Sequence, residues 1–382
     1  MSELSYLENL LNGVEVKWLA LENAAELKRG KRLVRSQLEL EGEFAVYQNS
    51  MTPLGYYHQH NTNPDTTFVI CAGAAGEIGY SSSPFWAADD VYYVASTNLL
   101  NSKFLYHYLL TQKNKISSQV RKASIPRLSK TSLDRIFVPI PCPNIPEKSL
   151  AIQSEIVRIL DKFTALTAEL TAELTAELTM RKKQYNYYRD KLLSFEEGGV
   201  EWKTLGEIVK MRAGQHISAR NIVDGKEGDF VYPCFGGNGI RGYVKEKSHD
   251  GEHLLIGRQG ALCGNVQRMK GQFYATEHAV VVSAMQGIDI DWAFHMLTTM
   301  NLNQYASKSA QPGLAVGKLQ ELKLLVPSIE RQKYIAKMLD KFDTLTGSIT
   351  EGLRREIELR QKQYEYYRDL LFSFPKPETA SN

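Results

Sequence analysis

Polar side chains flanked by glycines in the second half of the chain have the chemistry for contacting nucleic-acid bases. Arg258 and Gln259 stand between Gly257 and Gly260. Glycine lets a backbone approach a ligand closely, and arginine and glutamine can each form two hydrogen bonds to one base edge. We expect base or phosphate contacts from this pair and from other polar residues in the loops of this half: His216, Arg220, Asn238, Arg241, Lys308, Ser309 and Gln311.

The first half carries a comparable set of residues. The basic cluster KRGKR contributes Lys28, Arg29, Lys31 and Arg32, and the polar stretch 48–63 contributes Gln48, Asn49, Tyr57 and His58. Lys122, Ser124 and Arg127 align with the segment 309–314 of the second half. These side chains suit phosphate and base contacts. The alternative for each of them is a solvated surface residue without a ligand.

An enzymatic site is weakly indicated. FGGNG at 235–239 fits the FxGxG pattern with which adenine methyltransferases bind S-adenosylmethionine. Such an enzyme also needs an (N/D)PP(Y/F) strand end to hold the flipped adenine. The nearest string, SPFW at 83–86, lacks the acidic or amide residue, and FGGNG precedes IRGYV as a glycine turn between strands would. A DNA adenine methyltransferase in its own right is therefore the alternative function.

Other catalytic signatures are missing from the sequence. It contains no GxxxxGK(S/T) phosphate loop, and Asp65 with Glu77-Ile78-Gly79 lacks the lysine of a metal-dependent nuclease. The four cysteines form no CxxC pair, which argues for reduced thiols in the cytoplasm and against zinc. We predict no catalytic residue, no metal site and no cofactor in this chain.

Bulk properties indicate a folded protein of several structural units. The chain has 382 residues, of which 43% are hydrophobic and 23% charged, and a net charge of +3. That charge permits nucleic-acid binding through a local patch without demonstrating it. No apolar run approaches the roughly 18–20 residues that a membrane span requires, and the N-terminal residues lack the features of a secretory signal. We expect a cytoplasmic protein with no membrane contact.

A long helical segment occurs twice. IQSEIVRILDKFTALT (152–167) matches RQKYIAKMLDKFDTLT (331–346), and RKKQYNYYRDKLLSF (181–195) matches RQKQYEYYRDLLFSF (360–374), at one constant spacing. Thr-Ala-Glu-Leu is repeated head to tail three times inside the first copy. Apolar residues recur at three- and four-residue steps there, which predicts a helix. We expect helical spacers at 147–196 and 329–375 followed by a tail at 376–382, although Gly347 and Gly352 weaken the second helix.

The apolar stripe of each spacer needs a covering partner. The positions expected to pack against the other helix or a partner subunit are Leu160, Phe163, Leu170, Leu174, Leu178, Tyr185 and Tyr188 in the first copy, and Leu339, Phe342, Ile349, Leu353, Ile357, Tyr364 and Tyr367 in the second.

The segments between the helices also match one another. VEVKWL (14–19) aligns with VEWKTL (200–205), and FWAADDVYYV (85–94) aligns with FYATEHAVVV (273–282). Short β-branched runs separated by Gly, Asn and Pro predict strands and loops. We therefore expect an α+β protein with two mixed α/β domains, 1–146 and 197–328, separated by an antiparallel two-helix coiled coil in a pseudo-twofold internal repeat. The N-terminal SYLENLL also resembles a continuation of the C-terminal helix.

This layout, with its LDKF, QYxYYRD and TAEL segments, resembles the specificity subunits of type I restriction-modification enzymes, the type IC subgroup in particular. The resemblance covers essentially the whole chain. It implies that each globular domain is a target recognition domain that reads one half of a split DNA sequence. It further implies that the coiled coil docks two modification subunits, which methylate adenine, and that restriction (motor-nuclease) subunits join that complex. S-adenosylmethionine, ATP and Mg would be bound only by the partner subunits.

The TAEL tract has dimensions that suit a spacing device. Four helical residues add about 6 Å and a net rotation of about 40°. One base pair of DNA advances about 3.4 Å and rotates by about 34–36°. One TAEL unit is thus expected to reorient a distal domain by about the angle of one base pair. A coiled-coil scaffold that binds only protein would leave the two glycine-rich, polar-loop domains unexplained.

Overall fold

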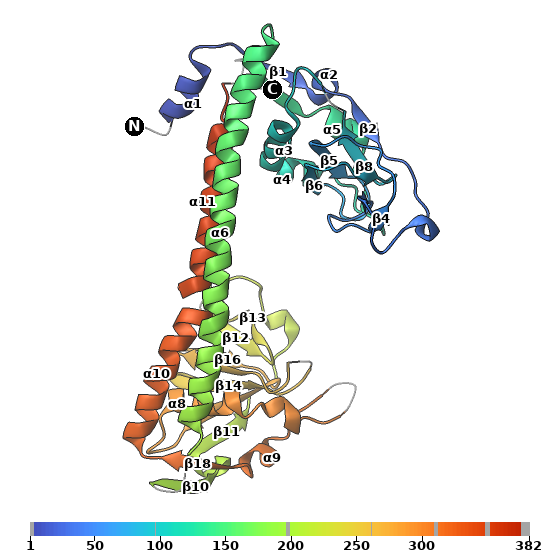
Figure 1. Cartoon of the computed structure of the whole chain (residues 1–382). Helices are drawn as coiled ribbons and strands as arrows, with labels where there is room; N and C mark the ends of the chain where they lie inside the picture. Colours follow the sequence, from blue (N-terminus) through green and yellow to red (C-terminus); the bar gives the residue numbers. More distant parts are fainter. Residues whose placement is uncertain are drawn as a thin grey trace. The chain divides into compact units, whose positions relative to one another are not determined.

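The longest element is a helix, α6 (Pro146–Leu193), which contains the whole TAEL tract. Proline is favoured in the first turn of a helix, and neither proline nor glycine follows within α6. Its 48 residues extend over about 70 Å at about 1.5 Å per residue. In Figure 1 this helix is drawn in green.

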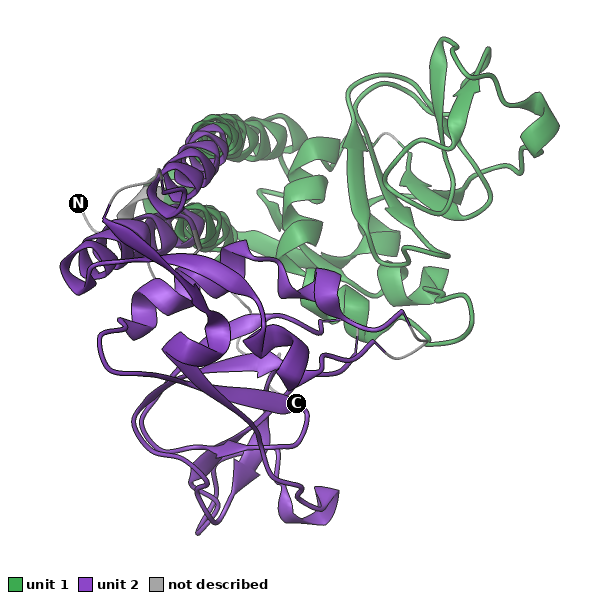
Figure 2. Ribbon diagram, turned by 90° about the horizontal axis from the view of Figure 1, so that it is seen from below, with its two compact units in different colours: residues 1–174, 357–382 green, residues 175–356 purple. Residues whose placement is uncertain are grey.

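The computed structural model describes residues 4–95, 97–195, 199–260, 262–308, 312–347 and 352–375. The chain divides into two compact units, shown in two colours in Figure 2. Unit 1 comprises Met1–Leu174 and Ile357–Asn382, and unit 2 comprises Thr175–Glu356. Each unit therefore combines one globular half with parts of two long helices.

In unit 1 the first part of α6 packs against α11 (Gly352–Leu371) (Figure 1). The rings of Phe163 and Tyr367 stack with centroids 5.5 Å apart and planes at 4°. The hydroxyl oxygens of Thr164 and Tyr364 are 3.2 Å apart. Residue numbers rise along one helix as they fall along the other, so the two helices are antiparallel.

In unit 2 the last part of α6 packs against α10 (Ile329–Gly347) in the same way. Tyr188 stacks on Phe342 with centroids 5.8 Å apart, and Tyr185 forms a hydrogen bond with Asp343. The phenylalanine of LDKF thus meets a tyrosine of YYRD in both units. The repeated sequence motifs are explained by one repeated helix contact.

The second helical copy differs from the expected single long element. It forms two helices, because α10 ends at Gly347 and α11 begins at Gly352. Gly352 has φ of +78°, and a Cβ there would lie 2.7 Å from the main-chain oxygens of Thr344 and Leu345. A left-handed residue in such close contact interrupts a right-handed helix. Ile349 lies outside the described residues.

The globular part of unit 1 contains three sheets. Strands β1 and β9 pair alone, β2-β8-β5-β6 form a four-stranded sheet, and β4-β3-β7 form a three-stranded sheet in which β3 and β7 are parallel. Their bounds are β1 Val16–Ala20, β2 Leu27–Arg29, β3 Phe44–Tyr47, β4 Gly55–Tyr57, β5 Thr66–Ile70, β6 Ile78–Ser81, β7 Trp86–Ala87, β8 Val91–Val94 and β9 Phe137–Pro141. The helices are α1 Leu4–Leu11, α2 Leu21–Ala24, α3 Ser102–Thr111, α4 Lys113–Ser118 and α5 Lys130–Asp134, with a 3-10 turn η1 Arg35–Gln37.

Unit 2 repeats this topology. Strands β10 and β18 pair alone, the four-stranded sheet is β11-β17-β14-β15, and the three-stranded sheet β13-β12-β16 again contains one parallel pair. The bounds are β10 Val200–Thr204, β11 Val209–Ala213, β12 Tyr232–Gly236, β13 Gly239–Val244, β14 Glu252–Gly257, β15 Val266–Lys270, β16 Tyr274–Ala275, β17 Ala279–Ala284 and β18 Lys323–Pro327. The helices are α7 Leu205–Ile208, α8 Ile290–Thr299 and α9 Val316–Gln320, with 3-10 turns η2 Ala219–Asn221 and η3 Leu302–Tyr305.

The pairing of β1 with β9 corrects one sequence alignment. Trp18 lies opposite Pro139 in that pair, and Trp202 lies opposite Leu325 in β10–β18. Leu21 and Leu205, each the first residue after its strand, donate main-chain hydrogen bonds to the equivalent carbonyls at 136 and 322. Trp18 therefore corresponds to Trp202, two residues away from the match of VEVKWL with VEWKTL. A slip of two residues keeps the same side chains on each face of a strand, so the apolar pattern could not reveal it.

Residues from both ends of the chain share the core of unit 1. Leu7 and Leu11 of α1 belong to the same buried cluster as Leu371, Phe372 and Phe374. The Trp18 indole N–H donates a 2.8 Å hydrogen bond to the carbonyl of residue 375. This supports the interpretation of the N-terminal segment as a continuation of the C-terminal helix. Among the described residues, no helix combines the length and apolarity that crossing a membrane demands.

One close crossing recurs in both units and requires glycine. Gly30 follows β2, and a Cβ there would collide with the main-chain carbonyls of Ala87 and Ala88. Gly214 follows β11 and meets the carbonyls of residues 275 and 276 in the same way. The crossing fixes the path of the segment that follows each strand.

We predict that Gly30→Ala and Gly214→Ala each destabilise the chain by about 1–3 kcal/mol, because the added methyl group must displace main-chain atoms. Gly317→Ala is the matched control, since a Cβ at Gly317 in α9 has no atom within 4 Å. Alanine is expected to stabilise that helix by about 0.5–1 kcal/mol. Denaturant unfolding of the three variants measures both effects, and equal stabilities for Gly30→Ala and the parent chain would contradict the crossing.

Candidate nucleic-acid interface

In unit 1 a loop at 121–127 is closed by main-chain hydrogen bonds and carries three of the expected residues. The amide of Arg121 donates to the Arg127 carbonyl at 2.8 Å, and the reverse bond measures 3.2 Å. Gly73 N–H donates to the carbonyl of residue 126, and the amide of residue 128 donates to the Cys71 carbonyl. These bonds attach the loop to the turn that follows β5. Lys122, Ser124 and Arg127 lie on this loop, and all three are exposed.

Unit 2 contains the same loop with different side chains. The amide of Ser307 donates to the Gly313 carbonyl at 2.9 Å, and Gly260 N–H donates to the carbonyl of residue 312 at 3.0 Å. The amide of residue 314 donates to the Arg258 carbonyl at 2.9 Å. Arg258 and Gln259 thus lie beside the loop that carries Lys308. The expected residues Ser309 and Gln311 lie outside the described residues.

A third segment reaches the same edge in each unit. Gln48 and Asn49 follow β3, and the Asn49 carbonyl accepts a 2.9 Å hydrogen bond from the amide of residue 74. In unit 2 the equivalent segment is the short turn between β12 and β13, which contains Asn238. FGGNG is therefore a hairpin turn, as the following IRGYV suggested. Three loops meet in each unit: a Cβ at Gly73 would lie 2.7 Å from the Asn49 carbonyl oxygen, and a Cβ at Gly237, beside Asn238, would lie 3.1 Å from the Gln259 carbonyl oxygen.

Four polar side chains form a row in unit 2. Gln259 Oε1 is 2.7 Å from His278 Nδ1, His278 Nε2 is 3.7 Å from Glu277 Oε1, and the same carboxylate oxygen is 2.8 Å from His216 Nδ1. Burial raises the pKa of the Glu277 carboxyl group, but the hydrogen bond with His216, a main-chain hydrogen bond and the two neighbouring histidines together lower it below its usual value. The ionised carboxylate holds His216 and, through His278, orients Gln259. Glu277 and His278 were not among the expected residues, although the match of FYATEH with FWAADD marked their position.

The basic cluster 28–32 divides into anchored and free residues. Lys28 pairs with Glu26 at 3.5 Å, and Arg29 Nε donates to the main-chain oxygen of Asp89 at 2.7 Å. Lys31 and Arg32 continue past the glycine crossing. In unit 1 the amide of Lys31 donates a hydrogen bond to the carbonyl of residue 87. In unit 2 the amide of residue 215 donates the equivalent hydrogen bond to the carbonyl of residue 275. Arg32 therefore occupies in unit 1 the position of His216 in unit 2.

The remaining expected residues lie on other segments of the two units. Tyr57 packs edge-on against Trp86, and His58 pairs with Glu39 at 3.2 Å. Arg220 lies in η2 and Arg241 on β13. Within the described residues, no side chain of Tyr57, His58, Arg220 or Arg241 hydrogen-bonds to the loops. Arg241 follows the β12–β13 turn that contains Asn238, and Arg220 lies four residues after His216.

Several cations near the loops have no carboxylate partner. Among the residues that the structure describes, no ion pair is found for Lys31, Arg32, Lys122, Arg127, Arg258 and Lys308. Their charges are available for a phosphate backbone, to which lysine and arginine are the usual donors.

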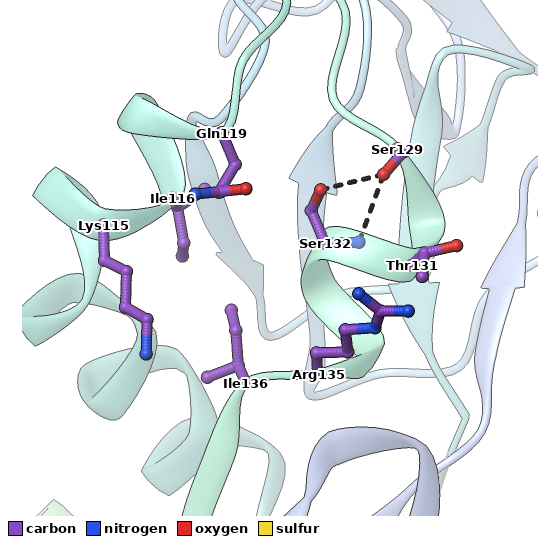
Figure 3. A pocket seen from close by; sticks show the side chains of 8 residues that line it. All are labelled: Lys115, Ile116, Gln119, Ser129, Thr131, Ser132, Arg135 and Ile136. Atoms are coloured by element: carbon purple, nitrogen blue, oxygen red, sulfur yellow. Dashed lines mark hydrogen bonds between the residues drawn. The ribbon is translucent and has the colours of Figure 1, made fainter. Parts of the chain in front are cut away.

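A pocket of about 330 Å³ lies at the base of the unit 1 loop (Figure 3). Its basic side chains are Lys115 and Arg135, and Ile116 and Ile136 supply apolar lining. Figure 3 shows the Ser129 hydroxyl bonded to Ser132 at the start of α5. No histidine, aspartate or glutamate lines the pocket. Its chemistry suits an anion and provides no general base.

The expected helix contacts fall into two groups. Leu160 and Leu339 are fully buried, and Phe163, Tyr185, Phe342, Tyr364 and Tyr367 make the contacts between helices described above or are half-buried beside them. Leu170, Leu174, Leu178, Leu353 and Ile357 are half-buried, and Tyr188 is 39% exposed. The stripe is thus covered at the LDKF segments and partly open between them.

Comparisons with known proteins agree with this architecture. A family model described as the type I restriction modification DNA specificity domain matches residues 14–180 and again 197–359. The specificity subunit of the Escherichia coli type I restriction enzyme EcoprrI is 59% identical over 377 residues, which cover 93% of this chain and 94% of that one. The EcoR124I/EcoR124II specificity subunit from the same species is 39% identical over 411 aligned residues and the full length of both chains.

Solved structures share the fold. A type I restriction-modification S subunit from M. genitalium has a TM-score of 0.55 at 19% identity and covers 96% of this chain and 98% of its own. A chain from a study of complex assembly and conformational transition in a type I R-M system has a TM-score of 0.62 at 14% identity, covering 94% and 97%. Since the family model and two relatives above 30% identity span almost the entire chain, this protein belongs to the type I restriction-modification DNA specificity family, as the non-catalytic subunit that recognises the DNA sequence.

Proposed function

We propose that the chain reads a two-part DNA target, with unit 1 contacting one half and unit 2 the other through the three-loop edge. The observation that supports this is one backbone arrangement present twice with different side chains. In unit 1 Ala72 forms an antiparallel bridge with Arg127, and in unit 2 Gln259 forms the same bridge with Gly313. Arg127 therefore corresponds to Gly313, and Ala72 corresponds to Gln259. Two frames with unlike side chains suit two unlike half-sites.

The phosphate-contacting residues in this proposal are the cations for which the described part of the chain supplies no carboxylate partner. Lys122, Arg127, Lys31 and Arg32 supply them in unit 1, and Arg258 and Lys308 supply them in unit 2. Phosphate contacts set the register on the duplex, and Gln259 or Asn49 would contact base edges. In this proposal the exposed side chains of the loops, which differ between the two units, determine the base sequence of each half-site.

The long helices are proposed to dock two modification subunits, one for each copy of the QYxYYRD segment. Apolar side chains stay exposed on these helices: Tyr187 is 60% exposed and its counterpart Tyr366 is 55% exposed. Met180 and Leu166 add to the open surface on α6. Exposed apolar surface of this kind favours a protein partner. Restriction (motor-nuclease) subunits would join through the assembled complex.

Cofactor chemistry is assigned to the partners in this proposal. S-adenosylmethionine would be bound by the modification subunits, and ATP and Mg by the partner subunits of the holoenzyme. The protein is placed in the cytoplasm because its substrate is chromosomal or invading DNA. The purified chain alone is expected neither to bind S-adenosylmethionine nor to methylate DNA, and to do both once mixed with its modification subunit.

Deleting Thr171–Leu174, one TAEL unit, is expected to shorten the unspecified spacer in the preferred target by one base pair. The physical reason is the net rotation of about 40° per four helical residues, close to the 34–36° of one base pair. Methylation by the reconstituted complex on duplexes of graded spacing measures the preference, and both half-sites should stay the same. An unaltered preferred spacer would refute the spacing function of the tract.

The double variant Lys122→Ala with Arg127→Ala is expected to make the negative slope of log K against log salt concentration shallower by about 2. For each phosphate contact that is lost, binding of the complex to DNA releases about 0.9 fewer counterions. Binding of the complex to its target at several salt concentrations gives the slope. Lys270→Ala is the matched control, because Lys270 already pairs with Glu252 at 2.6 Å. A slope equal to that of the control would place the loop away from DNA.

A further inference from the structure

Each unit carries the same buried joint between its globular part and its long helix. In unit 1, His107 Nε2 on α3 lies 3.3 Å from Asp161 Oδ1 on α6. In unit 2, His295 Nε2 on α8 lies 2.8 Å from Asp340 Oδ1 on α10. Both histidines are the sixth residue of their helix, and both aspartates belong to the LDKF motif. The side chains of the two histidines are 2% and 0% exposed, and those of the aspartates are 38% and 37% exposed.

A glutamine makes the second link of each joint. Gln153 Oε1 accepts a 2.8 Å hydrogen bond from the amide of Asn101, and its Nε2 donates to the Leu99 carbonyl at 3.0 Å. Gln332 repeats both bonds, with the amide of Asp289 at 2.8 Å and the carbonyl of Gly287 at 3.2 Å. Both glutamines are fully buried. The two links are two helical turns apart on the long helix, so together they fix an angle as well as a position.

A cation completes each joint. Lys103 Nζ donates to Asp161 Oδ2 at 2.7 Å, and the Arg268 guanidinium contacts Asp340 at 2.5 Å and Asp291 at 3.0 Å. Arg268 also lies over the Phe294 ring at 4.1 Å. Although His295, Asp340 and Asp343 lie close together, the guanidinium against Asp340 and the hydrogen bond from Tyr185 to Asp343 satisfy these carboxylates. In unit 2 a cation and a hydroxyl thus engage the two carboxylates beside His295.

The histidines enter the joints uncharged. Burial lowers the pKa of His107, although Asp161 opposes the shift, and burial likewise lowers the pKa of His295 against the effect of Asp340. A neutral ring that forms a hydrogen bond to the aspartate through Nε2 has one preferred orientation. The carboxylate is held between that ring and the cation, and this arrangement restricts rotation of the domain helix on the long helix.

We propose that Asp161 and Asp340, with their histidine partners, are positioning residues that determine how sharply the complex distinguishes targets of different spacing. This inference rests on the proposed two-part reading. Each joint fixes the angle at which a base-contacting edge is carried on its long helix. A rotation of about 34–36° equals one base pair, so a joint that tilts by a fraction of that angle would let one domain reach a half-site displaced by one position.

The experiment uses the chain in complex with its modification subunits and measures methylation of duplexes with the preferred spacer and with one base pair more or fewer. We expect Asp161→Ala and Asp340→Ala each to lower the ratio of preferred to altered spacing about tenfold, with both half-site sequences unchanged. A tenfold change corresponds to about 1.4 kcal/mol. Glu169→Ala is the matched control, since it removes an exposed carboxylate from the same helix as Asp161.

The ratio separates positioning from stability. A purely structural role would reduce methylation by one factor at all spacings and leave the ratio unchanged, and that result would overturn the proposal. Asp161→Asn keeps the shape and an acceptor for His107 and serves if the alanine variant does not fold. It loses the charge that Lys103 needs, so we expect a roughly threefold lower ratio, and no change in it counts equally against the proposal. A parent complex that methylates all spacings alike would instead refute the two-part reading.

Discussion

The stacking of a phenylalanine from LDKF on a tyrosine from YYRD is the contact on which both units depend. Phe163 with Tyr367 and Phe342 with Tyr188 set the register of two antiparallel helix pairs. The residue beside each phenylalanine, Thr164 or Asp343, meets a second tyrosine one turn away. Asp161 and Asp340, two residues before these phenylalanines, contact the histidines of the globular parts. One four-residue motif therefore joins helix to helix on one side and helix to domain on the other.

The duplicated framework separates what is shared from what differs. The two units share main-chain hydrogen bonds, the glycine crossing and the buried glutamine, all of which act through backbone geometry and close packing. The loop side chains differ, because their contacts are not required for the fold. Arg32 and His216 occupy one position, as do Asp89 and Glu277. Since recognition lies in exposed side chains on a fixed frame, the frame can stay the same while the target changes.

Much of the architecture could be predicted because it depends on local pattern. The absence of proline and glycine after Pro146 predicted α6, and the repeated LDKF and QYxYYRD segments indicated the duplication. The break before Gly352 was marked by glycine, but its position depends on a left-handed backbone pressed against Thr344 and Leu345. The equivalence of Trp18 and Trp202 was missed, because period-two patterning is unchanged by a slip of two residues.

Prediction of the site was less complete for a different reason. The loop at 121–127 could be matched with its counterpart from the alignment of Lys122, Ser124 and Arg127 with 309–314, and Arg258 and Gln259 do lie beside that counterpart. Tyr57, His58, Arg220 and Arg241 have the same chemistry but make no side-chain hydrogen bond to these loops within the described residues, since residue type alone does not fix which side chains meet. Glu277 and His278 were passed over because their function is to hold other side chains. The parallel pairing of β3 with β7, and of β12 with β16, brings these segments together across long stretches of sequence.

The composition of the two units has a consequence for biosynthesis. Unit 2 is one uninterrupted stretch, Thr175–Glu356, whereas unit 1 combines the beginning of the chain with residues after Ile357. Phe372 and Phe374 belong to the core around Phe104 and Leu7. All residues of unit 2 are therefore synthesised before unit 1 can bury Phe372 and Phe374. Until then the emerging first half exposes an apolar face, and translation leaves it dependent on the final segment for closure.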